Sequence, residues 1–187
     1  NLLYFDLPPN SSQPIGGVKK SITYMGSGLL GGKVPVIILI ALAVTLAVWF
    51  ILKKLRFGRN VYAVGGNAEA ANVSGIKVTA TLIGVYGIAG LLYGLAGFLE
   101  CARTGGATSA YGLNYEFDAI ASCVVGGVSN TGGIGTVPGM VVGVLIFGII
   151  NYGLTFIGVN PYWQQIIKGI IIIAAVGFDI RKNLRRK

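Results

Sequence analysis

VPVIILIALAVTLAVWFIL, residues 34–52, is the stretch that decides the fold, because it contains no charged side chain. Its length approaches the roughly 20 apolar residues that an α-helix needs to cross the hydrocarbon core of a bilayer. The basic sequence KKLRFGR, residues 53–59, follows directly, and basic residues are enriched on the cytoplasmic side of membrane spans. The stretch therefore predicts a transmembrane helix that runs from outside to inside.

The composition extends this prediction to the whole chain. Of its 187 residues, 53% are hydrophobic and 11% are charged, whereas soluble domains carry roughly 25% charged residues. Most basic residues lie in two clusters, 53–77 and 181–187, which are typical of cytoplasmic segments, so we expect no nucleic-acid partner. The chain has no His, and Cys101 and Cys123 lie far apart, so we expect no metal site and no disulfide framework. We predict an all-α polytopic protein in the lipid bilayer.

The apolar runs set the expected order of segments along the chain. Residues 1–33 are rich in Pro, Gly and Ser and predict an extracytoplasmic loop segment with a short helix around residues 18–24. The membrane domain, 34–187, is expected to have spans at about 34–52, 78–101, 117–128 (short), 136–157 and 164–179. Arg103 could pair with Glu100 after the second span. The chain begins at Asn1 without Met, and we expect further spans to precede it in a longer protein.

The short segment 117–128 is assigned by counting crossings. The basic residues Lys77 and Arg181 are both expected on the cytoplasmic side, so the number of crossings between them must be even. The long runs supply three crossings. The short segment and the glycine-rich break SNTGGIG, residues 129–135, must supply the fourth. Interrupted helices are tolerated in a membrane only where protein or a water-filled cavity surrounds them, so residues 117–135 are a candidate pathway element.

Polar side chains at membrane depth are the candidates for a pathway. Ionisable and polar groups there are functional candidates by default, and we select Asp118, Asn130 and Asn151. Asp118 could instead cap the short helix, and Asn151 could hydrogen-bond to a neighbouring helix. Lys168 is expected to extend outward from the last span to the membrane surface.

Glycines recur at helical spacing in two of the predicted spans. Steps of three and four residues keep small side chains on one face, which lets helix backbones approach closely in lipid. Tight packing is the expected role, and helix sliding during gating is the alternative. The glycines are Gly84, Gly87, Gly90, Gly94 and Gly97 in one span, and Gly135, Gly139 and Gly143 in the next.

The cytoplasmic loop 53–77 contains a predicted helix of its own. In GGNAEAANVSG, residues 65–75, Asn67 can cap the helix and Glu69 falls in the first turn, where the helix dipole favours a carboxylate. Gly75 suits the end of the helix. A small helix on the cytoplasmic face is what a membrane subunit needs to receive force from a soluble partner; the alternative is an ordinary loop helix. The chain has no GxxxxGK[ST] motif and no catalytic constellation, so we expect no enzyme activity, no catalytic residue and no ATP site in it.

Three stretches resemble bacterial sugar ABC-importer permeases of the ribose/galactose type. They are GRNVYAVGGNAEAANVSGIKV (58–78), NYEFDAIASCVVGGVSNTGGIGTVPG (114–139) and INYGLTFIGVNPYWQQIIKGIIIIAAVGFD (150–179). The part NYGLTFIGVNPYWQ, residues 151–164, is most similar to the galactose/methyl-galactoside type. The resemblance covers about residues 34–187, the C-terminal half of such a permease. It implies a multi-helix importer permease with a cytoplasmic coupling helix and one short interrupted helix.

The resemblance also implies partners and a coupling site. The partners are two cytoplasmic ABC ATPase subunits, which bind the ATP, an extracytoplasmic sugar-binding protein, and a second permease copy in a homodimer. The family's coupling segment corresponds here to Gly65, Gly66, Asn67, Glu69, Ala70, Ala71 and Gly75. The Ile-x-Leu-Pro that usually follows is absent, because Ile76 is followed by Lys-Val-Thr.

Three functions remain open from the sequence. The first is ATP-driven import of galactose or methyl galactoside through the bacterial cytoplasmic membrane. The second is the same machine with ribose, another pentose, a nucleoside or an autoinducer-like furanose as cargo. The third is an ion-coupled carrier or an intramembrane enzyme, which would use buried carboxylates within its spans.

Overall fold

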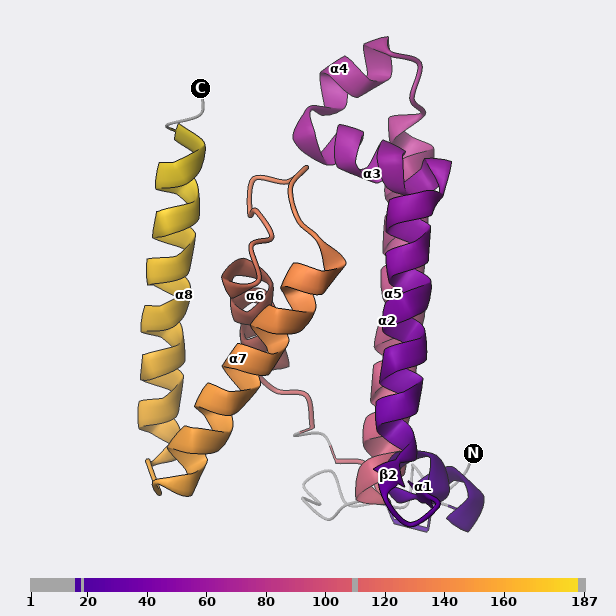
Figure 1. Cartoon of the computed structure of the whole chain (residues 1–187), viewed down its shortest axis with the longest axis vertical. Coiled ribbons are helices and arrows are strands. Elements are labelled where there is room, and N and C mark those ends of the chain that lie inside the picture. Colours follow the sequence, from indigo (N-terminus) through magenta and orange to yellow (C-terminus); the bar gives the residue numbers. More distant parts are fainter. Residues whose placement is uncertain (1–15, 18, 109–110, 185–187) are drawn as a thin grey trace, which may run out of the picture. The chain divides into compact units, whose positions relative to one another are not determined.

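The computed structural model describes residues 16–17, 19–108 and 111–184. Helices and one two-stranded hairpin make up the regular structure of these residues (Figure 1). The elements are α1 (Lys20–Ser27), β1 (Leu29–Leu30), β2 (Val34–Pro35), α2 (Val36–Lys54), α3 (Arg56–Gly66), α4 (Ala68–Val73), α5 (Val78–Thr104), α6 (Tyr115–Val125), α7 (Val137–Phe156) and α8 (Pro161–Leu184).

Three of these helices, α2, α5 and α7, are long and apolar enough to cross a membrane. None of the residues in the most apolar part of α2 or α5 is buried within the described structure. Apolar side chains that are exposed along a whole helix are typical of a surface that faces lipid or further helices. The expected all-α membrane fold is confirmed.

The described residues form two compact units, to both of which α2 and α5 contribute. The first unit holds α1, the hairpin, the beginning of α2 and the end of α5. Here the backbone of Gly26 lies directly against the backbone of Ala102 and Arg103, and Ala102 is fully buried. Arg103 also forms an ion pair with Glu100, with 2.8 Å between Nη2 and Oε1, as the sequence predicts.

In the second unit, α6 packs against both α7 and α8 (Figure 1). An added methyl group on Gly143 of α7 would collide with the Ser122 carbonyl of α6, and Gly126 and Gly139 also lie backbone to backbone. Phe147, one turn after Gly143 in α7, is 2% exposed. The small residues of α7 therefore serve close helix packing, which is the role expected for them.

Along α5 the glycines have a different environment. An added methyl group on Gly87, Gly90, Gly94 or Gly97 would meet no atom within 4 Å among the described residues. At Gly84 it would lie 2.7 Å from the ring of Phe57. Of these five glycines, Gly84 alone meets a neighbouring side chain among the described residues.

Helix α3 is an element that the sequence analysis does not predict. The loop 53–77 was expected to hold one small helix, but its first half forms α3. Phe57, Val61 and Val64 recur at helical spacing along α3, and all three are partly or fully buried. The signal is easily missed because the helix also contains three glycines and two arginines, which lower its helix propensity and mean hydropathy.

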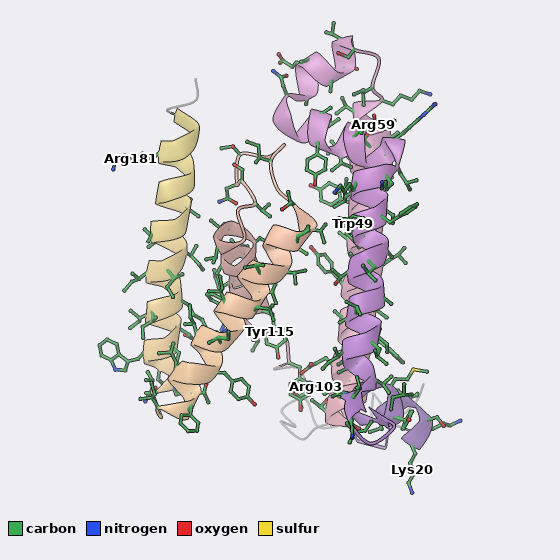
Figure 2. All side chains as sticks on the ribbon, in the orientation of Figure 1. Lys20, Trp49, Arg59, Arg103, Tyr115 and Arg181 are labelled. Carbon is green, nitrogen blue, oxygen red and sulfur yellow. The ribbon has the colours of Figure 1, made fainter. Side chains whose placement is uncertain are left out.

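Helix α6 is shorter than the predicted segment 117–128, since it ends at Val125, where Gly126 and Gly127 follow. Gly127 has a φ of 81°, a conformation that glycine adopts at little cost. An eleven-residue helix rises only about 16 Å. The glycine-rich segment 129–135 follows α6 and lies against the end of α3. Arg59 and Arg181 lie toward that same end of the unit (Figure 2).

Candidate functional site

Helix α4 is the element that the sequence analysis assigns to coupling. The Asn67 side chain caps it by accepting a hydrogen bond from the Ala70 N–H at 2.9 Å. Glu69 lies in its first turn, where the carboxylate stabilises the positive end of the helix dipole. The helix has six residues, which is about 1.7 turns. Gly75, with a φ of 83°, then turns the chain toward α5.

The exposed face of α4 is the surface that it offers to a partner. Asn67, Glu69 and Ala70 are exposed, as a contact with another protein requires. Val73 is 89% exposed, which makes it a large apolar side chain of this face that the family motif does not include. A shallow depression beside the helix is lined by Ala68, Glu69, Asn72, Lys77, Val78 and Thr79.

Three of the predicted coupling residues do not lie on this face. Ala71 is only 4% exposed, so its methyl group packs inward and holds α4 in place. Gly65 and Gly66 end α3 and lie against Gly132 and Gly133 of the segment after α6. They contact another part of this chain rather than offering side-chain surface to a partner.

The basic residues around α3 define the end of the unit that carries α4. Lys53 lies over the indole ring of Trp49, with its Nζ 5.3 Å from the ring centroid. Such a cation–π pair is typical of the border between lipid and water, where aromatic and basic side chains gather. Arg56 and Arg59 follow on α3 and are exposed. Basic side chains are therefore enriched at the end of the unit that carries α3 and α4.

Asp118, a predicted pathway residue, forms an ion pair that the sequence analysis does not predict. Its Oδ1 lies 2.8 Å from the Nζ of Lys168, and Lys168 donates a hydrogen bond to its Oδ2 at 3.0 Å. Two predictions are therefore wrong: Asp118 does not cap α6, and Lys168 does not extend outward from α8. An ionised pair within an apolar bundle is more stable than two separate charges there, so the pair fastens α6 to α8.

The other two pathway candidates lie on separate elements. Asn151 is in α7, and its Oδ1 is buried without a hydrogen-bond partner among the described residues. Asn130 is exposed in the turn after α6, where it makes an interaction with its surroundings. An unsatisfied buried carbonyl costs about 1–3 kcal/mol. Of the two residues, Asn151 is therefore the stronger candidate for a hydrogen bond to a ligand or to a further helix.

Known proteins with similar sequences are permeases. Residues 6–176 match the family described as the permease component of the branched-chain amino acid transport system. The galactose/methyl galactoside import permease protein MglC of Haemophilus influenzae is 50% identical over 100% of this chain and 56% of its own length. The protein of the same name from Escherichia coli K12 is also 50% identical, with the same coverage.

A second kind of relative is more distant. The ribose import permease protein RbsC of Bacillus subtilis is 44% identical over 89% of this chain and 52% of its own length. No solved structure gives a significant match. The chain thus spans about half the length of the curated relatives that it matches. The family model covers most of the chain, including every helix from α1 to α7, and the chain therefore belongs to the branched-chain amino acid transport system permease family.

Proposed function

We propose that this chain forms part of the membrane permease of an ATP-driven importer for galactose and methyl galactoside. The observation that carries the proposal is the 50% identity, along the whole chain, to two relatives named as galactose/methyl galactoside import permeases. The resemblance read from the three sequence motifs points to the same class of transporter. The permease moves the sugar and leaves ATP hydrolysis to separate subunits.

The mechanism begins at α4. Two cytoplasmic ATPase subunits bind ATP and close, and the exposed face of α4, with Asn67, Glu69 and Val73, receives their motion. A second permease copy completes the pathway, and an extracytoplasmic binding protein delivers the sugar. Selection then rests mainly on the binding protein, which agrees with spans that contain few polar side chains.

Ribose import is the second candidate, because a ribose import permease is 44% identical to most of the chain. The three matching stretches include the coupling loop, so they do not by themselves choose between the two sugars. The stretch 151–164 favours galactosides through its similarity to that type.

Uptake in liposomes tests the proposal. The full-length permease, its ATPase and its binding protein are reconstituted, and ATP-dependent uptake of labelled galactose is measured with unlabelled methyl galactoside, ribose or a nucleoside as competitor. Competition by methyl galactoside alone is the expected result. Uptake of ribose instead would keep the ATP-driven machine and replace the cargo. Uptake that stops with a protonophore but resists vanadate would overturn ATP coupling and point to an ion-coupled carrier.

A further inference from the structure

The end of α3 and the glycine-rich turn after α6 touch backbone to backbone. An added methyl group on Gly65 would lie 2.8 Å from the Gly133 nitrogen, and one on Gly133 would lie 2.6 Å from the Gly66 Cα. One on Gly132 would collide with the Gly65 carbonyl. No side chain fits between two backbones at this distance, so a displacement of one must move the other.

A hydrogen bond fixes this contact at its side. The Tyr62 hydroxyl, one turn before the end of α3, donates to the Gly135 carbonyl at 3.1 Å. Tyr62 is half-buried, so water competes less strongly for the bond than at an open surface. The contact therefore resists sliding as well as compression.

The turn behaves as one piece because it is closed on itself. The Ser129 N–H donates to the Ile134 carbonyl at 2.9 Å, and the Gly132 N–H donates to the Ser129 carbonyl at 3.2 Å. Gly132 and Gly133 both have positive φ, 90° and 71°, which L-residues with a side chain rarely adopt. The turn presents these two glycines at its tip, where a bulkier residue would block the contact.

Each side of the contact continues into a larger element. On one side, Gly126 and Gly139 lie in backbone contact, which ties the turn to both α6 and α7. On the other side, the Asn67 N–H donates to the Ala63 carbonyl at 3.0 Å, and its side chain caps α4. Asn67 thus ends α3 and begins α4, so α4 cannot rotate without moving the end of α3.

We propose that Gly65, Gly132 and Gly133 form a joint that passes displacements of α4 to the α6–α7 pair during transport. This inference rests on the proposed function, since it assigns the route by which the motion received at α4 reaches the membrane helices. The three glycines are positioning residues: they bind neither sugar nor ATP. Their role is to let two backbones meet without a compressible side chain between them.

Sugar taken up per ATP hydrolysed is the quantity that tests the joint. In the reconstituted full transporter, Gly65→Ala places a methyl group where the turn lies and separates the two surfaces. We expect this ratio to fall about tenfold, a size typical of lost coupling between two sites, while ATP hydrolysis and complex assembly persist. Gly148→Ala in α7 is the matched control, because a methyl group there meets no described residue within 4 Å, and it should leave the ratio unchanged. An unchanged ratio in Gly65→Ala would overturn the joint.

Tyr62→Phe decides the question if Gly65→Ala does not assemble. It removes only the hydrogen bond to Gly135, and the loss of one such bond predicts a fall in the ratio of about threefold. A ratio equal to that of the unmodified transporter would count against the joint.

Amide hydrogen exchange separates this inference from the choice of cargo, because it needs no sugar. ATP binding should change exchange at residues 68–73 and 129–135 in the unmodified complex. In Gly65→Ala the change at 68–73 should remain and the change at 129–135 should disappear. A change that persists at both places would refute the joint even where the cargo proves to be galactose. If the unmodified complex changes at both places and Gly65→Ala changes only at 68–73, the joint stands even where the cargo proves to be ribose, and only the proposed function is corrected.

Discussion

The ion pair between Asp118 and Lys168 shows how a single polar contact can organise an apolar bundle. The Lys168 side chain is 21% exposed and that of Asp118 is 32% exposed, so each charge has lost much of its water. Removing one partner leaves the other poorly solvated, which costs more than the pair itself contributes. The contact links residues fifty positions apart and is therefore invisible from either helix alone.

We expect Lys168→Met to lower the stability of the permease by about 2 kcal/mol, between the values for exposed and buried pairs. Thermal unfolding of the full permease in detergent measures the effect. Lys168→Arg keeps the charge and should recover most of the stability. The double variant Asp118→Leu, Lys168→Met removes both charges and should be more stable than Lys168→Met. Equal stability of all four proteins would show that the pair contributes nothing.

At the scale of the elements, apolar runs predict the long helices well. They do not predict helix ends or short helices that depend on packing against other elements. The run 34–52 becomes α2 with a shift of two residues, because Val34 and Pro35 pair with β1 instead. The end of α6 moves to Val125 because Gly126 turns the chain toward α7. Helix α3 is missed because it has few apolar side chains. Their packing role is evident only from their burial in the structure, as for Val64. Which glycines pack closely also depends on neighbours that no periodicity reveals.

The packing of α6 on α7 gives a prediction at this scale. Gly143→Val would force a branched side chain into the Ser122 carbonyl and the Gly126 nitrogen, and overpacking of this kind costs about 1–3 kcal/mol. Thermal unfolding combined with size-exclusion chromatography of the full permease would show a lower melting temperature and loss of the monodisperse peak. Gly148→Val is the matched control on the same helix, where an added methyl group meets no atom of the described part of the chain within 4 Å. A Gly143→Val protein as stable as this control would contradict the packing described here.

For the whole molecule, the sequence predicts the family and the coupling helix, but not which coupling residues are exposed. The motifs identify the segment 65–75, and the Asn67 cap and the position of Glu69 follow from local chemistry. The burial of Ala71 and the contacts of Gly65 depend on how α3, α4 and the turn after α6 fit together. Local rules carry no information about that fit.

Glu69 gives the prediction for the assembled transporter. Glu69→Arg reverses the charge at the exposed start of α4, opposes the helix dipole and changes the face offered to the ATPase. We expect ATP-driven uptake to be abolished while the permease still folds and inserts into the membrane, as measured by vesicle uptake and by membrane fractionation. Glu69→Asp keeps the charge and should retain uptake. Normal uptake by Glu69→Arg would remove α4 from the coupling route.

The shortness of α6 has an electrical consequence. In the crossing that we predict for this segment, the helix covers only about half of a hydrocarbon core of about 30 Å, and protein or water must surround the rest. Where water surrounds the rest, the insulating layer is thinner and the membrane voltage falls over a shorter distance. Such a field would act on the carboxylate of Asp118 and on the ammonium of Lys168. Because the two charges are opposite, moving the pair as a unit carries no net charge through that field, so the ion pair adds no voltage dependence at such a thin point.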